Sequence, residues 1–129
     1  MATSTDALRY VIQRHDASFV HYDLRLEHDG VAKSWALRKE PNDTDKRLAT
    51  PVADHSIDYM SFEGTIPEGY GAGTVEIWDS GTYTVRSWKA DKIVVAIDGK
   101  RLKGEYVLVK MKGWKVVESK KGWLFFRKR

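Results

Sequence analysis

Residues 14–30, RHDASFVHYDLRLEHDG, hold three histidines and four carboxylates within seventeen positions. If this segment is extended, side chains two positions apart lie on the same face of the strand. One face is then polar (His21, Asp23, Arg25 and Glu27) and the other is apolar (Tyr22, Leu24 and Leu26). Imidazole, carboxylate and guanidinium groups can hold a metal ion, transfer a proton or bind an anion, so this segment is the first candidate for a functional site.

The side chains of His15, His21 and Asp23 are candidate metal ligands. Two imidazoles and one carboxylate form a common ligand set for a divalent ion, and they leave positions open for water or substrate. His21 and Asp23 would share a strand face with their Cα atoms about 6.5–7 Å apart, and His15 would approach from the preceding segment. The alternative is two surface histidines beside an Asp23–Arg25 salt bridge, and the spacing leaves both open.

Arg25 on the same face indicates an anionic substrate, because a guanidinium does not ligate metals but binds phosphate or carboxylate oxygens through two parallel N–H groups. Lys39 and Arg47 could add positive charge to such a site. The alternatives are a solvated cation at the end of a strand for Lys39 and one on a helix surface for Arg47.

His55 lies in the segment ADHSIDY and is a candidate general acid, since histidine gives and takes protons near neutral pH. Tyr59 follows four positions later and would share the face of His55 if this segment were helical. The alternatives are a polar residue at the start of a helix and a half-buried tyrosine.

A two-residue turn at Asp29-Gly30 would position the polar face. With that turn, His21, Asp23 and Arg25 pair with Arg38, Ala36 and Ser34, and Glu27 pairs with Ala32. Small side chains opposite large polar ones leave space above the polar row, so we expect a concave active site.

Short alternating segments between turn signals recur along the rest of the chain and predict a mainly β fold. We expect a second hairpin turning at Asp79-Ser80-Gly81, two strands around Asp98-Gly99, and a closing strand in residues 121–129. Residues 41–62 are the only helical candidate, and Pro51 interrupts them. The expected architecture is a small closed or nearly closed β-barrel with one or two short helices, since closure removes exposed sheet edges.

The chain has 129 residues, a net charge of +4 and no cysteine. These values predict one domain spanning residues 1–129 with a loose tail at 1–8, and a cytoplasmic monomer without disulfides or membrane spans. Residues 110–129 hold eight Lys or Arg, one Glu and four large aromatics. This basic end is typical of nucleic-acid contact, although a solvated terminal strand would have the same composition.

Several segments together resemble the 3′-phosphoesterase family, the end-healing modules fused to bacterial DNA ligase D that also occur as small separate proteins. The segments are QRHDASFVHYDLRLEHDGVAKSWALRK, DKRLA, DHSIDYMSFEGTIPEGYGAGTVEIWDSGTY, RLKGEYVLVKMKG and GWLFFRKR, and they cover the chain from about Tyr10 to Arg129. Two segments, IPEGYGAG and KEPNDTDK, are shorter here than in the common form of the family.

The resemblance implies a β-barrel enzyme that removes a terminal ribonucleoside from a DNA or RNA primer end and then hydrolyses the remaining 3′-phosphate to a 3′-hydroxyl. It implies a divalent ion, most often Mn²⁺ with Zn²⁺ or Co²⁺ as alternatives, and a separate DNA ligase as partner. By position, the family's metal ligands match His15, His21 and Asp23, its phosphate-contacting cations match Arg25, Lys39 and Arg47, and its other active-site residues match His55 and Tyr59.

Two other functions remain open from the residues alone. His21, Asp23 and a distant His55 imitate the facial triad of non-haem iron oxygenases, although 129 residues leave little room for that fold. The chain could also be a non-catalytic nucleic-acid-binding barrel with incidental histidines.

Overall fold

The computed structural model describes residues 8–69, 72–111 and 122–128. These residues form nine strands and one 3₁₀ helix. The strands are β1 (Leu8–Asp16), β2 (Val20–His28), β3 (Val31–Leu37), β4 (Arg47–His55), β5 (Gly64–Ile66), β6 (Gly73–Trp88), β7 (Lys92–Gly99), β8 (Lys103–Lys110) and β9 (Trp123–Arg127), and helix η2 is Ile57–Ser61. Among the described residues no helix is long and apolar enough to span a membrane.

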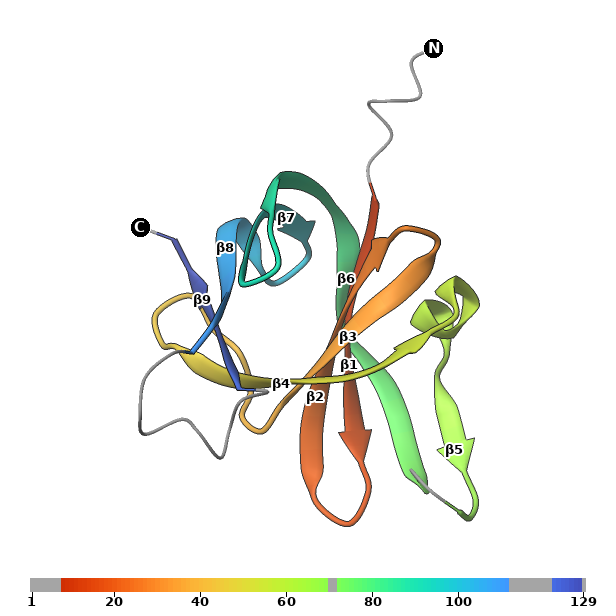
Figure 1. The fold of residues 1–129 in the computed structure, drawn as a ribbon. Helices are drawn as coiled ribbons and strands as arrows, with labels where there is room; N and C mark the ends of the chain where they lie inside the picture. Colours follow the sequence, from red (N-terminus) through yellow and green to blue (C-terminus); the bar gives the residue numbers. More distant parts are fainter. Residues whose placement is uncertain (1–7, 70–71, 112–121, 129) are drawn as a thin grey trace.

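The strands close into an antiparallel barrel (Figure 1). Their order is β1-β2-β3-β4-β9-β8-β7-β6, and β1 pairs with β6 to complete a ring of eight, while β5 is attached to the far edge of β6. The long strand β6 closes the ring because it pairs with the whole of β1, from Leu8 opposite Tyr83 to Asp16 opposite Thr74. The predicted mainly β barrel is confirmed. Its single five-residue helix agrees with the lower of the two helix numbers expected.

The β2–β3 hairpin has the predicted turn and register. Asp29 and Gly30 both have positive φ, 54° and 81°, as the tight two-residue turn requires. Asp23 pairs with Ala36 and Arg25 pairs with Ser34. The polar residues of β2 therefore face small partners across the hairpin.

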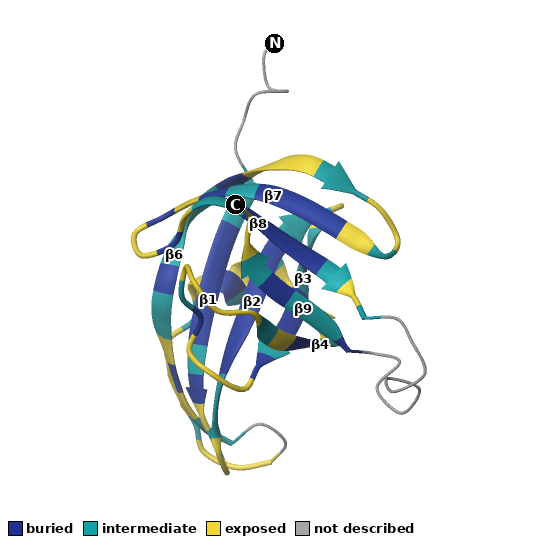
Figure 2. Ribbon diagram, turned by 90° about the vertical axis from the view of Figure 1, so that its left-hand side faces the viewer, coloured by how far each residue is buried: buried dark blue, intermediate teal, exposed yellow. Residues whose placement is uncertain are grey.

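The hydrophobic core lies inside the barrel and is formed by the apolar side chains on the inner face of the strands. Its largest cluster takes alternate residues of β1, β2 and β3 together with residues of the strands that complete the ring (Tyr10, Ile12, Tyr22, Leu24, Leu26, Trp35, Leu37, Ala49, Tyr83, Ile93, Val95, Ile97, Leu102, Tyr106, Leu108 and Phe125). Figure 2 shows long buried stretches along β1, β2, β7 and β8. Each fully buried large apolar side chain contributes about 1.5–3 kcal/mol to stability. With the interior occupied in this way, the polar face of β1–β3 points outward.

The predicted turn at Asp79-Ser80-Gly81 is wrong, because β6 continues through these residues. Asp79 is 2% exposed, and its carboxylate accepts hydrogen bonds from the backbone N–H groups of Lys100, Arg101 and Leu102 at 2.8–3.0 Å and from Tyr10 Oη at 2.8 Å. The polar residue that resembled a turn signal therefore stabilises the β7–β8 turn from a neighbouring strand. That turn lies at Lys100–Arg101, just after the expected position, while β7 and β8 are confirmed.

The glycine at position 81 is also explained by a contact between strands rather than by a turn. A Cβ atom at this position would collide with the backbone oxygen of Asp98 on β7, so the close approach of two strands requires glycine there.

The predicted helical segment at 41–62 is largely a strand. Residues 47–55 form β4, which pairs with β3 through Leu37–Ala49 and Trp35–Pro51, and only η2 is helical. Sheet pairing on both sides of the first part of β4 overrides the local signal. Pro51 is tolerated because the described pairing of β4 with β9 ends at Ala49.

Two sequence predictions concern residues that the structure does not fully describe. The expected tail overlaps residues 1–7, which lie outside the described residues, whereas Leu8 already begins β1. The closing strand is present as β9, but much of the basic segment before it, residues 112–121, also lies outside them.

Candidate active site

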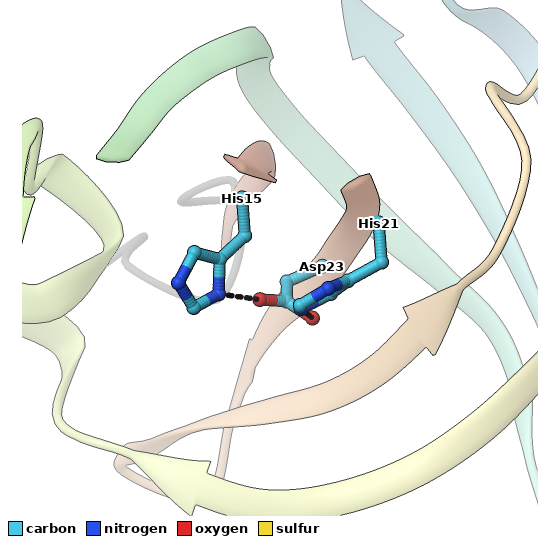
Figure 3. A group of neighbouring side chains, drawn as sticks. All are labelled: His15, His21 and Asp23. Carbon is cyan, nitrogen blue, oxygen red and sulfur yellow. Dashed lines mark ion pairs between the residues drawn. The ribbon is translucent and has the colours of Figure 1, made fainter. Parts of the chain in front are cut away.

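His15, His21 and Asp23 converge at the end of the β1–β2 hairpin. His15 lies directly opposite His21 in the strand register, and Gln13 lies opposite Asp23, so the four side chains share the outer face of the sheet. One ligand atom from each of His15, His21 and Asp23 lies within 4.8 Å of the others. Figure 3 shows both imidazoles beside the Asp23 carboxylate, with 3.9 Å from His15 Nδ1 to Oδ2 and 3.4 Å from His21 Nε2 to Oδ1.

This donor set fits a divalent transition metal. Two imidazole nitrogens and one carboxylate, grouped within one ion's reach, match the nitrogen and oxygen ligands that such ions take in open sites. The hydrogen bond from His21 to Asp23 raises the pKa of His21, with a smaller contribution from the backbone carbonyl of Phe19. A bound ion would take the place of the proton that this pKa favours.

Arg25 is the most tightly held cation of the site. It is 3% exposed and donates from Nε to Gln13 Oε1 at 2.5 Å, from Nη1 to Ser34 Oγ at 2.7 Å and from Nη2 to Asp23 Oδ2 at 3.3 Å. Burial lowers the pKa of Arg25, and the charge of Asp23 opposes this effect. The small side chain of Ser34 leaves room for the guanidinium, as the hairpin register predicts.

His55 and Tyr59 reach the site from the other side. His55 ends β4, and Tyr59 lies in η2, where the two rings stack with centroids 4.5 Å apart and planes 23° apart. The guanidinium carbon of Arg25 lies 4.9 Å from the centre of the Tyr59 ring. Burial, together with the positive charge of Arg25, lowers the pKa of His55.

Contacts with β1 hold η2 in place. Gln13 is fully buried, and its Nε2 donates to the backbone oxygens of Tyr59 at 2.8 Å and Phe62 at 3.2 Å. A small apolar cluster of Val11, Ala32 and Met60 packs beneath the helix. Gln13 thus joins Arg25 to the element that carries Tyr59. Sequence reasoning missed Gln13, although strand alternation two positions before His15 is a signal that identifies it.

All six of these site residues line one groove of about 630 Å³. They are His15, His21, Asp23, Arg25, His55 and Tyr59, and Phe19 and Arg38 add to the lining at the hairpin end. The predicted concavity is present, but it lies on the outer face of the barrel wall. Sequence reasoning missed Phe19 and included Arg38 only as the register partner of His21.

Lys39 and Arg47 do not line this groove. Arg47 Nε donates to the backbone oxygen of Glu40 at 2.8 Å, and its Nη2 lies 3.6 Å from the Asp45 carboxylate. Lys39 is exposed just after β3. Their roles as phosphate-contacting cations stay predictions.

The arrangement combines three chemical capacities within one groove. It offers a ligand set for a divalent ion, a fixed guanidinium that favours an anion, and an imidazole that can exchange a proton. This combination suits transfer or hydrolysis of an anionic ester, in which negative charge grows on oxygens during the reaction.

Comparison with known proteins gives a consistent result. Residues 13–110 match the family model of the DNA ligase D 3′-phosphoesterase domain. The chain is 44% identical over 133 aligned positions, covering 92% of its length, to the multifunctional non-homologous end joining protein LigD of Pseudomonas aeruginosa. The LigD proteins of Mycobacterium bovis (45%, covering 84% of the chain) and Mycolicibacterium smegmatis (40%, covering 92%) are also similar. The chain spans only 15–16% of the length of these relatives.

Proposed function

Because this chain belongs to the DNA ligase D 3′-phosphoesterase domain family, we propose that it processes the 3′ ends of DNA or RNA primer strands as a metal-dependent phosphoesterase. The proposed reactions are removal of a 3′-terminal ribonucleoside, which leaves a 3′-phosphate, and hydrolysis of that phosphate to a 3′-hydroxyl. The observation that carries the proposal is the convergence of His15, His21 and Asp23 beside Arg25 in one groove.

His15, His21 and Asp23 would hold the divalent ion, which we propose to be Mn²⁺, with Zn²⁺ or Co²⁺ as alternatives. Such an ion supplies Lewis-acid stabilisation of the phosphoryl oxygens. The contact of His21 Nε2 with Asp23 Oδ1 at 3.4 Å holds the imidazole beside the carboxylate before any ion binds.

Arg25 would stabilise the charge that grows on the phosphoryl oxygens. Its contacts with Ser34 and Asp23 use one N–H of each terminal nitrogen, and since Arg25 lines the groove, a second N–H on either nitrogen would bind a substrate oxygen. Its orientation is fixed by the same contacts before substrate arrives, and this preorganisation is what makes charge stabilisation effective in a buried site.

His55 would exchange a proton with the leaving oxygen. Burial and the charge of Arg25 lower the pKa of His55, which favours the neutral imidazole in the empty groove. A bound phosphate dianion would favour the imidazolium and raise that pKa, so the proton donor would form when substrate is present. Tyr59, stacked on the ring, would limit the rotation of His55.

The basic end of the chain would hold the nucleic-acid strand. In its described part, Arg127 and Lys128 are exposed on or beside β9, and Lys46 Nζ lies 4.9 Å from the centre of the Phe126 ring. We further propose that the protein acts as a cytoplasmic monomer, on the same ends as a separate DNA ligase.

The decisive experiment incubates a 5′-labelled primer that ends in one ribonucleotide with the protein, with Mn²⁺ or with chelator, and sizes the products. We expect a 3′-phosphate species followed by a 3′-hydroxyl species in Mn²⁺ only. His21→Ala and His55→Ala should lose both products while remaining folded. His28→Gln is the matched control, because His28 stacks on Trp88 outside the groove. A protein that binds the primer equally well after chelation and releases no product would instead be a binding barrel.

A further inference from the structure

Phe19 is an exposed aromatic side chain beside the candidate metal ligands. It lies between β1 and β2, it is 53% exposed, and it belongs to neither apolar cluster of the barrel. Its ring nevertheless lines the groove and lies 6.0 Å from the ring of His21, centroid to centroid. Covering this large apolar surface with a ligand removes it from water, which favours binding.

Arg38 completes this position from the end of β3. Its guanidinium carbon lies 4.8 Å from the centre of the Phe19 ring, and Arg38 also lines the groove. Within residues 8–69, 72–111 and 122–128, no carboxylate forms an ion pair with Arg38 (the ion pairs of the structure involve other cations). The Arg38 guanidinium thus lies over one face of the Phe19 ring, which leaves the other face to stack on a base. Aromatic faces and cations are the groups by which proteins bind single-stranded nucleic acid.

We propose that Phe19 and Arg38 bind the nucleoside whose 3′-oxygen carries the reacting phosphate. The Phe19 ring stacks on the base, and the Arg38 guanidinium pairs with the phosphate on the 5′ side of that nucleoside. The inference rests on the proposed function, since it takes the reacting phosphate to lie at His15, His21 and Asp23. The short separation between the His21 and Phe19 rings suits one nucleoside, whose ribose joins the phosphate to the base.

Stacking of this kind predicts little discrimination between bases, because every base has an aromatic face. It also separates the base contact from the chemistry. Phe19 is not one of the candidate ligands, and its substitution leaves the contact between His21 and Asp23 in place.

The test measures binding and hydrolysis of a 5′-labelled primer with a 3′-phosphate, in two forms that carry either a base or an abasic sugar at the terminal nucleoside. For wild type we expect the abasic form to bind about 5- to 160-fold more weakly, which corresponds to loss of one base–aromatic stack. Phe19→Ala should weaken binding of the base-bearing primer by a similar factor, raise KM with kcat unchanged, and leave the abasic primer unaffected. Phe19→Trp should restore binding.

Val85→Ala is the matched control, since Val85 is also exposed but lies outside the groove. Arg38→Met should reduce the salt dependence of binding by about one phosphate contact.

Wild-type KM in Phe19→Ala, or an equal loss on both primers, would overturn the inference. If wild type prefers the base-bearing primer but releases no phosphate, the proposed function fails while the stacking site stands. If phosphate is released and Phe19→Ala affects only ribonucleoside removal, the stacking partner is the leaving nucleoside and the inference is wrong.

Discussion

Asp79 and Asp23 are both buried carboxylates of the same sheet, yet their surroundings differ in kind. Asp79 is 2% exposed and accepts four short hydrogen bonds of 2.8–3.0 Å, three of them from backbone N–H groups. Asp23 is 7% exposed, and its neighbours are two imidazoles at 3.4 and 3.9 Å and one guanidinium at 3.3 Å. The first carboxylate is saturated by donors that cannot leave, whereas the second lies between one fixed guanidinium and two imidazoles that can exchange partners.

This difference separates a structural carboxylate from one that can do chemistry. Backbone donors fixed by a turn satisfy a charge permanently, and such a group has no capacity left for a ligand. Imidazoles change protonation near neutral pH and bind metals through the same nitrogens. Burial and charge alone would not distinguish the two residues. The identity and distance of their partners do.

Asp23→Asn should have the largest effect, because it removes the only carboxylate among the three candidate ligands. We expect kcat/KM for release of phosphate from a 3′-phosphate primer in Mn²⁺ to fall by about 10³-fold, roughly 4 kcal/mol in activation free energy. The metal-free protein should stay folded with a melting temperature that falls less than that of Asp79→Asn, because buried Arg25 loses its ionic partner but the amide oxygen can still accept its hydrogen bond. Wild-type rates from this variant would remove Asp23 from the proposed mechanism.

Asp79→Asn should show the opposite pattern. The amide would place an N–H₂ group against donors that now meet a carboxylate oxygen. The charge-assisted hydrogen bonds would be lost, which lowers the free energy of unfolding by about 3 kcal/mol. We expect thermal unfolding to shift down by on the order of 10 °C, while kcat/KM at a temperature well below the transition stays near wild type. A variant as stable as wild type would show that the four donors do not depend on the charge of Asp79.

Metal addition should sharpen the comparison further. Mn²⁺ at about ten times its dissociation constant stabilises a protein by roughly 1.4 kcal/mol, and thus raises its melting temperature by about 5 °C. Wild type and Asp79→Asn should both show this rise, and chelator should reverse it. Asp23→Asn serves as the control that should not respond, so an equal rise in that variant would place the ion elsewhere.

The smallest expected effect is a shift in the titration of His55, which shares the groove with Asp23. In metal-free protein, NMR titration should give a pKa below the usual 6.5, because burial and Arg25 disfavour the imidazolium. Inorganic phosphate should move the pKa upward, since a dianion beside the ring favours the charged form. An unchanged titration would indicate that phosphate does not bind next to His55.

Sequence reasoning succeeded where short-range geometry decides the structure. The Asp29-Gly30 turn fixes the register of β2 and β3, and alternation then fixes which side chains share a face. The turn and the alternation together are enough to place Arg25 opposite Ser34. The shared groove of His15, His21 and Asp23 follows from the same hairpin logic, once β1 is paired with β2.

The sequence predictions were wrong where contacts with strands distant in the sequence determine the local structure. Asp79 resembles a turn residue locally, but its partners are twenty or more positions away in the β7–β8 turn. Residues 47–55 are a strand only because β3 and β9 flank the start of β4. Phe19 gave no periodic signal at all, because its significance comes from lying across from Arg38 at the end of β3.

The two pairings of β1 differ greatly in the length of chain they enclose. His15 meets His21 across a hairpin of five intervening residues, whereas Leu8 meets Tyr83 only when most of the chain has been arranged. Loop closure becomes entropically costlier with length, and contacts distant in sequence slow folding. The three candidate ligands, His15, His21 and Asp23, therefore lie on the pairing of β1 that closes the shorter loop, and their grouping depends least on the β1–β6 seam. If the proposed ion binds there, it would stiffen β1 before ring closure, and folding should be faster with Mn²⁺ than with chelator.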